Sequence, residues 1–556
     1  MNKKVCSFPI MFALLALLIG TCAVVFPASA QAAPTSTGSI TVSGTVASSY
    51  DAYQIFSANV VDGDSDAKIA TDFAWASDAA RDAVLPVLHS AGMPNSQTTA
   101  QEAAEWLNTD SHLTSALSAQ LARSLQSSGA EPVALNAGTA AELHCGYWLI
   151  VADDDAIAQD EAGTAPIMAL VGGSAVTVKP KAATPKVAKH VLEDSTAAWQ
   201  KAADATVGDD LYWRLSATVP AGLTAYDTYT VQFVDTMSAG LDPSKVAASM
   251  HVYVAAGADG GFDAVSAGRD GRAGTEPAKG WTDITAQCAT KVAADGKTFT
   301  VRTGDLIAAL GGADAFTAGA RVVAVYNAPL NSACNHGIAK GNPNEVYLRY
   351  PRSPLADQSG DAGFTRTPSD DACAYTWDLA LTKRGSDGDK PLAGAVLSIA
   401  DDRGRTLAAD GTWAADGKAT VTTGEDGRVT VSGVDSGKLE VRELKAPKGY
   451  TAFEGARSVT VKAEGLDVDQ VAAAKPKLTI TAESPLRADS ADGSTGSLEA
   501  SLINTPTGTP PSITTGGFMP STGDMAMYAA AAAAVAGAAL IVVALLVKRG
   551  GGSHKE

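Results

Sequence analysis

The chain has few basic and few aromatic residues. Its 556 residues include 42 lysines and arginines against 60 aspartates and glutamates, for a formal net charge of -18, and 6% of its residues are aromatic. Binding to nucleic acid depends on the neutralisation of phosphates by basic side chains. The charge balance therefore argues against nucleic acid as a partner and indicates an acidic, soluble surface.

Cysteine is equally scarce. Of the six cysteines, two precede residue 31, which leaves Cys145, Cys288, Cys334 and Cys373. Cys288 and Cys334 fall in one expected domain and are the pair that we expect to be able to form a disulfide, with free buried thiols as the alternative. So few cysteines cannot staple a chain of this length, and the stability of the fold must have another source.

The sequence signatures of the common enzyme classes are missing. No His-Glu-x-x-His zinc motif, phosphate-binding loop or Gly-x-Ser-x-Gly nucleophile elbow occurs. The histidines are scattered, which argues against a zinc site. Asp62, Asp64 and Asp66 begin like a calcium-binding loop, but the turn glycine and the closing glutamate do not follow. We therefore expect no enzyme activity toward a substrate, no metal site and no cofactor.

The N-terminal segment has the features of a signal peptide. Lys3 and Lys4 precede an apolar run over residues 11–25, and Ala28–Ala30 is typical of a cleavage site. We expect a signal peptide over residues 1–30 and a secreted mature chain.

The C-terminus carries a second apolar run. Residues 525–547 contain no charged residue and are long enough for a transmembrane helix, which needs roughly 20 residues. Lys548 and Arg549 follow directly and indicate a cytoplasmic tail over residues 548–556. An ordinary membrane anchor is the simplest interpretation of this segment.

Between these two segments, the apolar pattern predicts a mainly β protein. Ser39–Val46 alternates like a half-buried strand, whereas Ala100–Leu125 carries apolar residues at helical spacing. Short strand-like runs separated by Gly, Asp and Pro then continue to about residue 504 and indicate β-sandwiches. We expect three tandem domains and two linkers: a β domain with a helical insertion over 31–178, a linker over 179–186, a sandwich over 187–371, another over 372–504 and a Pro/Thr/Gly stalk over 505–518.

A pentapeptide directly precedes the C-terminal apolar run, and its residues are Met519, Pro520, Ser521, Thr522 and Gly523. With the apolar run and the basic tail, it resembles the Leu-Pro-any-Thr-Gly cell-wall sorting signal of Gram-positive surface proteins. In that family a sortase cuts between Thr and Gly and transfers the Thr carbonyl to an amine. The resemblance implies that Thr522 is an acyl donor and that the apolar run is a temporary anchor.

The last expected domain contains another motif. The run from Glu443 to Tyr450 reads Glu-Leu-Lys-Ala-Pro-Lys-Gly-Tyr. It resembles the E-box, Glu-Thr-x-Ala-Pro-x-Gly-Tyr, of the CnaB-type domains of Gram-positive pilins and adhesins, with Leu444 in place of Thr. In that family the E-box glutamate promotes an isopeptide bond between a first-strand lysine and a last-strand asparagine. The resemblance assigns these roles to Glu443, Lys383 and Asn504, which are otherwise a surface lysine and a turn asparagine.

The implied chemistry is physically coherent. An amine attacks a carboxamide only when it is neutral, and apolar burial lowers the pKa of a lysine. A carboxyl group that burial keeps protonated can polarise the amide carbonyl and shuttle protons. Ammonia then leaves, and the cross-link remains.

The second sandwich offers a similar trio. Lys189 lies in its first strand, Asp235 follows an apolar pair, and Asn344 opens its last strand. The arrangement resembles the CnaA-like middle domains of fimbrial backbone subunits, in which an aspartate promotes a lysine–asparagine bond. The resemblance implies that Asp235 promotes a bond between Lys189 and Asn344, with Asn342 as a rival acceptor.

The linker carries the last motif. Val176–Lys181 reads Val-Thr-Val-Lys-Pro-Lys and resembles the pilin motif of sortase-assembled backbone subunits, Val-x-Val-Tyr-Pro-Lys. The resemblance implies that Lys181 accepts Thr522 of the next subunit. Lys179 and Lys186 lie close enough to compete for this role.

In this order the motifs resemble those of a major, or backbone, fimbrial subunit of Gram-positive bacteria, built from immunoglobulin-like CnaA-like and CnaB-type domains. The implied partners are identical subunits, a class C-like sortase for polymerisation, a housekeeping sortase for attachment to peptidoglycan, and tip or base ancillary pilins. An ancillary pilin or a monomeric wall-anchored adhesin with the same modules is the alternative. A secreted wall enzyme is disfavoured because the catalytic motifs are missing.

Overall fold

The computed structural model describes residues 36–508, apart from 65–66, 110, 182–183, 222 and 258–279. The predicted signal peptide, sorting motif, membrane helix and cytoplasmic tail all lie outside the described residues. Within the described part of the chain, no helix combines the length and the apolar character that crossing a membrane requires.

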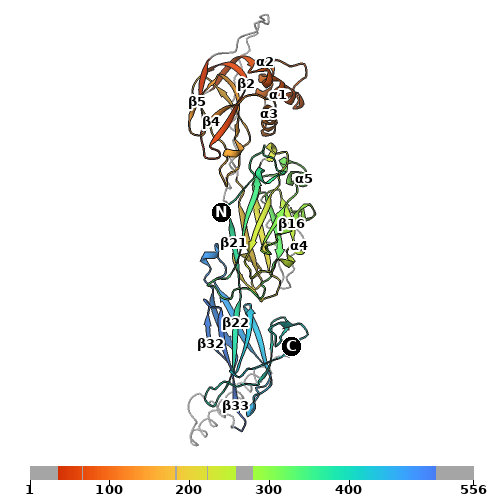
Figure 1. Ribbon diagram of the computed structural model, residues 1–556, viewed down its shortest axis with the longest axis vertical. Helices are drawn as coiled ribbons and strands as arrows, with labels where there is room; N and C mark the ends of the chain where they lie inside the picture. The colour runs from red at the N-terminus through yellow and green to blue at the C-terminus, as the bar shows by residue number, and fades with distance from the viewer. Residues whose placement is uncertain are drawn as a thin grey trace, which may run out of the picture.

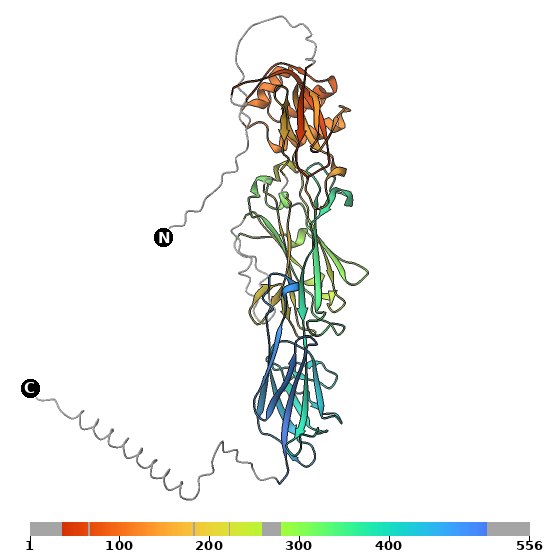
Figure 2. The same ribbon diagram turned by 90° about the vertical axis from the view of Figure 1, so that its left-hand side faces the viewer.

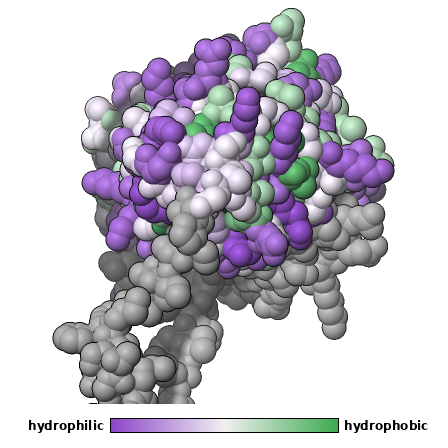
Figure 3. Space-filling view, turned by 90° about the horizontal axis from the view of Figure 1, so that it is seen from below, coloured by the Kyte–Doolittle hydropathy of each residue, from purple (hydrophilic) through white to green (hydrophobic). Residues whose placement is uncertain are grey.

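The described chain forms three β-rich bodies that follow one another in a line, in the order of the sequence (Figures 1 and 2). The strands assemble into six sheets, and the longer helices are confined to the first body. The predicted fold class, mainly β with a helical insertion near the N-terminus, is confirmed. Seen from the end at which the third body lies, the visible surface is mostly hydrophilic, with apolar residues scattered among polar ones (Figure 3).

The first body has two sheets, ordered β5-β1-β8 and β3-β2-β6-β7, with β4 paired to β2. Its strand β1 ends at Val42, earlier than the alternation predicts, because the chain turns at Gly44, where φ is +131°. The strands are β1 (Thr37–Val42), β2 (Ser49–Asp62), β3 (Lys68–Trp75), β4 (Val133–Asn136), β5 (Ala140–His144), β6 (Gly146–Ala152), β7 (Ile167–Val171) and β8 (Val176–Val178).

The helical insertion consists of α1 (Asp78–Ser90), α2 (Ala100–Asn108) and α3 (Ser115–Ser127). The single helical stretch predicted over 100–125 is two helices, because Thr114 caps a new N-terminus by accepting a hydrogen bond from the Leu117 amide. The helices bury alanine and leucine faces against the inner side of β2 and β6, and this cluster forms one of the two main cores of the body.

The second body is a sandwich of two sheets around one apolar core. The sheets are ordered β10-β9-β12-β18-β14-β15 and β11-β21-β19-β13-β17-β16, with β20 paired to β19. The elements are β9 (Val187–Glu193), β10 (Ala198–Gln200), β11 (Ala202–Asp204), β12 (Tyr212–Thr218), β13 (Gln232–Met237), α4 (Val246–Ser249), β14 (His251–Ala255), β15 (Thr282–Asp283), β16 (Ala289–Val292), β17 (Thr298–Arg302), α5 (Leu306–Ala309), β18 (Arg321–Asn327), β19 (Asn342–Pro351), β20 (Phe364–Arg366) and β21 (Asp370–Tyr375).

The third body is a second sandwich with its own core. Its sheets are ordered β27-β22-β33-β29, with β32 paired to β33, and β25-β24-β23-β28-β30-β31, with β26 paired to β23. The strands are β22 (Trp377–Gly385), β23 (Val396–Ala400), β24 (Thr406–Leu407), β25 (Trp413–Ala414), β26 (Val421–Thr422), β27 (Arg428–Val434), β28 (Gly437–Lys445), β29 (Tyr450–Thr451), β30 (Ala456–Glu464), β31 (Lys477–Ala482), β32 (Leu486–Asp492) and β33 (Ser497–Pro506).

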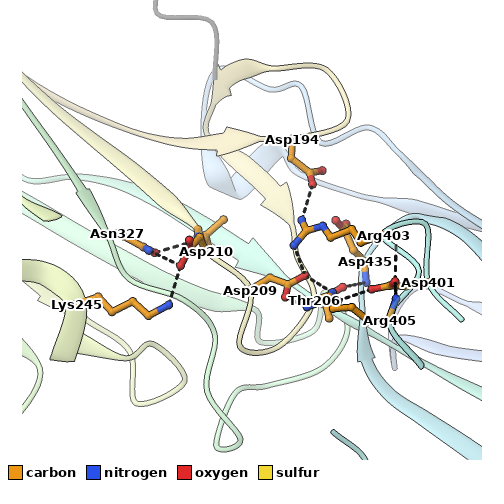
Figure 4. A network of polar contacts seen from close by, with 11 residues as sticks. Asp194, Thr206, Asp209, Asp210, Lys245, Asn327, Asp401, Arg403, Arg405 and Asp435 are labelled. Atoms are coloured by element: carbon orange, nitrogen blue, oxygen red, sulfur yellow. Dashed lines mark hydrogen bonds and ion pairs between the residues drawn. The ribbon is translucent and has the colours of Figure 1, made fainter. Parts of the chain in front are cut away.

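The second and third bodies are joined by continuous structure and by charge pairs. Strand β21 runs across the boundary predicted between residues 371 and 372 and leads into β22 after one residue. Arg405 of the third body donates to both carboxylate oxygens of Asp209 of the second, at 2.5 and 2.8 Å. Asp401 holds the Arg405 Nε at 2.6 Å, and Arg403 also reaches Asp209, at 3.1 Å (Figure 4). Bidentate pairs of this kind fix geometry as well as supply attraction.

The sequence left open whether Cys288 and Cys334 form a disulfide or remain free thiols. Cys288 and Cys334 are both free thiols. The Cys288 Sγ contacts the backbone oxygen of Ile284 at 3.2 Å, whereas the Cys334 Sγ lies 3.5 Å from the His336 Nε2. Burial raises the pKa of each thiol to about 11, so both are protonated at neutral pH.

Candidate functional site

The third body buries a lysine, an asparagine and a glutamate together. The inward row of β22 contains Trp377, Leu379 and Leu381, and the same alternation places Lys383 next in that row, with no exposed surface. Asn504 and Glu443 extend the inward rows of β33 and β28 in the same way. Each polar residue is therefore carried into the core by the apolar residues that precede it on its strand.

The topology brings Lys383 and Asn504 into contact although 121 residues separate them. Strands β22 and β33, the first and last long strands of the body, run side by side and parallel, with Gly385 opposite Asn504. The Lys383 Nζ donates a short hydrogen bond to the Asn504 Oδ1. Glu443 reaches both residues from the facing sheet.

Glu443 lies on the leaving-group side of the carboxamide. The Asn504 Nδ2 donates to Oε1 and Oε2 of Glu443 at 2.9 and 3.0 Å, and the Lys383 Nζ lies 3.2 Å from Oε1. The carboxyl group thus faces the two nitrogens, which suits the proton shuttling expected from the sequence and not the polarisation of the carbonyl oxygen. In this position it can receive a proton from the attacking amine and hand it to the departing nitrogen.

Burial also changes the pKa of Lys383. Desolvation lowers the pKa of Lys383 to about 8, and the attraction of the Glu443 carboxylate opposes this shift. About a tenth of the amine is therefore neutral at pH 7, and the neutral amine is the form that can attack a carbonyl carbon.

The second body holds the predicted trio across its two sheets. Lys189 is inward-facing on β9 of one sheet, whereas Asp235 and Asn344 are inward-facing on the adjacent strands β13 and β19 of the other. All three are fully buried. The Lys189 Nζ makes a short contact with the Asp235 Oδ2 and stands 5.5 Å from the centre of the Trp213 ring.

A fourth residue, Tyr326, completes this cluster and was missed from the sequence. Its hydroxyl oxygen lies 2.9 Å from the Lys189 Nζ, 2.9 Å from the Asp235 Oδ2 and 2.8 Å from the Asn344 Nδ2, which donates to it. Tyr326 lies on β18, where every residue from Val322 to Asn327 is buried, so no alternation along the strand marks it as a site residue. Its role as the link between Lys189 and Asn344 needed the fold.

The rival acceptor Asn342 is engaged elsewhere. Its side-chain amide exchanges two hydrogen bonds of 2.8 Å with the backbone of Asn335 and donates to the Ala374 oxygen at 3.2 Å. These contacts hold the loop before β19, and the Tyr326 hydroxyl contacts Asn344 instead.

Burial shifts both charged members of this cluster toward neutrality. Desolvation lowers the pKa of Lys189 to about 8 against the attraction of Asp235, and desolvation raises the pKa of Asp235 against the attraction of Lys189. A buried acid and a buried amine that both approach neutrality are suited to proton transfer.

The candidate acceptor lysines lie between the first and second bodies. Lys179, Lys181 and Lys186 are all exposed on the non-strand segment that joins β8 to β9. The backbone of Lys186 is held against Thr218 at the edge of β12, by bonds of 2.8 and 2.9 Å. Lys181 is thus open to a macromolecular reagent, while the pentapeptide that would supply the acyl group lies outside the described residues.

The first body uses its lysine structurally. Lys68 is buried at the start of β3 and donates to the backbone oxygens of Gly172 and Ser174 at 2.5 and 2.7 Å. Asp62, its carboxylate neighbour at 3.3 Å, is about half exposed. The contacts tie the loop between β7 and β8 to the β2–β3 hairpin.

The fold and the buried cluster give the third body the character of a prealbumin-like sandwich. Residues 378–475 match the family model described as the SpaA prealbumin-like fold domain. The matched segment contains Lys383 and Glu443, whereas Asn504 lies after it.

The particular proteins that this chain resembles are pilins of Gram-positive bacteria. It is 30% identical over 134 residues to the trypsin-resistant surface T6 protein of Streptococcus pyogenes, and the match covers 23% of each chain. Among solved structures, it is similar to the T6 backbone pilin of serotype M6 S. pyogenes, with 17% identity and a TM-score of 0.46 over 86% of this chain and 100% of that one. The full-length major pilin SpaD of Corynebacterium diphtheriae gives 14% identity and a TM-score of 0.41, with coverages of 86% and 100%. The roles of individual residues rest on the geometry of this chain.

Proposed function

We propose that this chain is a structural shaft subunit of a covalently polymerised surface fibre, stabilised by one intramolecular isopeptide bond in each sandwich. The observation that carries the proposal is the burial of Lys383 against Asn504 and Glu443, where the first and last long strands of the third body run side by side. The pilin relatives and the sorting-type pentapeptide support the same function.

In the third body, the neutral Lys383 amine attacks the Asn504 carboxamide carbon. Glu443 takes a proton from the attacking nitrogen and gives one to Nδ2, and the carbon–nitrogen bond to Nδ2 breaks. One amide bond replaces another, and one ammonia leaves. In the second body, Lys189 and Asn344 form an isopeptide bond by the same reaction. Asp235 and the Tyr326 hydroxyl transfer the protons.

The position of the bond suits a load-bearing element. Tension enters the third body along β22 and leaves along β33 toward the C-terminus. A bond between Lys383 and Asn504, which lie 121 positions apart, carries that load directly from one strand to the other and bypasses the chain between them. The sandwich then cannot lengthen under force by unravelling, and the bond also survives reduction, unlike a disulfide.

Polymerisation would join subunits through a second, intermolecular amide. A class C-like sortase would transfer the Thr522 carbonyl to the Lys181 amine of the next subunit, and a housekeeping sortase would attach the last subunit to peptidoglycan. The exposure of Lys181 supports this role. Adhesion would then depend on a tip or base partner held at a distance from the wall.

An immunoblot of wall extracts tests the polymer. We expect a ladder of high-mass species in the wild type and its loss in Lys181→Ala, because removal of the amine leaves the acyl donor without its acceptor. Lys179→Ala and Lys186→Ala are matched controls on the same segment and should keep the ladder. A single monomer band in the wild type would rule out a shaft.

The rate of bond formation should rise with pH. Because burial lowers the pKa of Lys189 and Lys383 to about 8, the neutral share of each amine grows roughly tenfold per pH unit below that value and levels off above it. The measurement is the loss of ammonia, followed by mass spectrometry, while chain recovered unfolded from inclusion bodies refolds at different pH values. Equal rates at about pH 6 and pH 8 would contradict amine deprotonation as the controlling step.

A further inference from the structure

A cavity of about 360 Å³ lies where the first body meets the second. The first body contributes Ile157 and Gln159, which follow β6, and the second contributes the ends of β19 and β20. Ligand sites are common at such junctions, and this volume falls in the range of small-molecule pockets.

The lining of this cavity is basic in an acidic protein. Its members are Ile157, Gln159, Arg349, Arg352, Phe364, Thr365 and Arg366, so three guanidinium groups line it and no carboxylate does. The chain as a whole carries a net charge of -18. Arginines suit an anion site, because guanidinium groups recognise oxyanions through paired N–H donors.

Neighbouring groups hold two of these arginines in place. The Arg349 Nη1 donates to the Asp361 Oδ1 at 2.7 Å and to the Gln232 Oε1 at 3.1 Å. When the Gln159 amide oxygen faces Arg366, it accepts from Nε at 3.0 Å and from Nη2 at 3.3 Å. The Arg349 guanidinium is therefore held by residues of the second body, and the Arg366 guanidinium by a residue of the first.

The third arginine has an unused donor. The Arg352 Nη1 donates to the backbone oxygen of Asp154 at 3.0 Å, whereas its Nε is buried and has no hydrogen-bond partner among the described residues. A buried N–H without a partner costs free energy. The nearby acids include Asp361, which already pairs with Arg349, Asp154, which lies close to Arg352, and Asp160, which follows Gln159.

We propose that this cavity binds a phosphate or sulfate ester of a sugar or polyol. A carboxylate offers two oxygens in one plane, whereas a tetrahedral oxyanion can accept from three guanidinium groups that approach from different strands. The nearly buried side chains of Phe364 and Ile157 supply an apolar surface for the carbon skeleton of the ester. The site does not depend on the cross-links or on polymerisation.

Calorimetric titration of the mature chain, kept in nonionic detergent with its C-terminal apolar segment, tests the site. Inorganic phosphate and inorganic sulfate should each bind with one-site stoichiometry. We expect Arg366→Gln to weaken binding at least about tenfold, because a charge-assisted pair to an oxyanion contributes roughly that factor. Arg366 is exposed, so this change leaves the fold intact. sn-Glycerol 3-phosphate and N-acetylglucosamine 6-sulfate then distinguish a phosphodiester polymer from a sulfated glycan as the source.

The control is Arg428→Gln, which removes a similarly exposed arginine from β27 of the third body. It should bind phosphate like the wild type. The proposal is overturned if the wild type shows no saturable binding of either anion, or if both variants weaken binding equally, which would indicate a general charge effect.

Discussion

Glu443→Gln is expected to leave the third body without its cross-link. The chain should retain one ammonia more than the wild type, because glutamine cannot take a proton from the Lys383 amine and deliver it to the Asn504 Nδ2, both of which Glu443 now contacts. Peptide mapping should lose the branched peptide that contains Lys383 and Asn504. Intact-mass spectrometry of the purified chain provides the first measurement.

The same variant should lose much of its stability. Closing a loop of about 100 residues removes chain entropy from the unfolded state that corresponds to nearly 5 kcal/mol, and here the bond spans 121 residues. The uncompensated Lys383 ammonium, left in the core beside a neutral amide, destabilises the fold further. Denaturant unfolding of the third body measures the total loss in its free energy of unfolding.

Glu440→Gln is the matched control for this result. Glu440 lies on the same strand β28 but is about half exposed and faces Lys438 at 3.5 Å. Its variant should keep the cross-link and the wild-type stability. A complete bond in Glu443→Gln would show that the carboxyl group is not needed.

Asp235→Asn is expected to abolish the bond of the second body alone. Asp235 is the buried acid that contacts Lys189, and its raised pKa lets it hold and release a proton. The chain should retain one ammonia, and the branched peptide of Lys189 and Asn344 should disappear, while the third body still cross-links. The two clusters share no residue, so we expect their effects to add.

Tyr326→Phe refines this prediction. The tyrosine hydroxyl is the group that joins Asn344 to the amine and the acid, and its loss should slow the bond of the second body without preventing folding. Asp242→Asn, in a turn of the same body where asparagine caps as well as aspartate, is the control. Equal rates of bond formation in Tyr326→Phe and the wild type would show that the hydroxyl takes no part in the reaction.

Alternation along each strand predicted which of its side chains face the core. Lys383, Glu443 and Asn504 each follow apolar residues at two-residue spacing, so their inward orientation was already fixed locally. That the three side chains contact one another was expected only from the E-box resemblance, because the spacing along one strand does not show which strand lies beside it. The helical insertion was equally predictable from its alanine and leucine pattern.

Contacts between distant strands could not be predicted in this way. Tyr326 reaches Asn344 from the opposite sheet, and the side chains of Arg405 and Asp209 meet across 196 residues of chain. No local pattern distinguishes these residues from the other tyrosines, arginines and aspartates of the chain. The state of Cys288 and Cys334 stayed open in the sequence for the same reason, since sharing a domain does not place two thiols together.

Intact-mass spectrometry of the wild-type mature chain tests the central claim most directly. The account predicts a mass lower than the sequence by two ammonia molecules, with branched peptides that join Lys189 to Asn344 and Lys383 to Asn504. A chain of full calculated mass would contradict the proposal that these buried clusters cross-link the shaft.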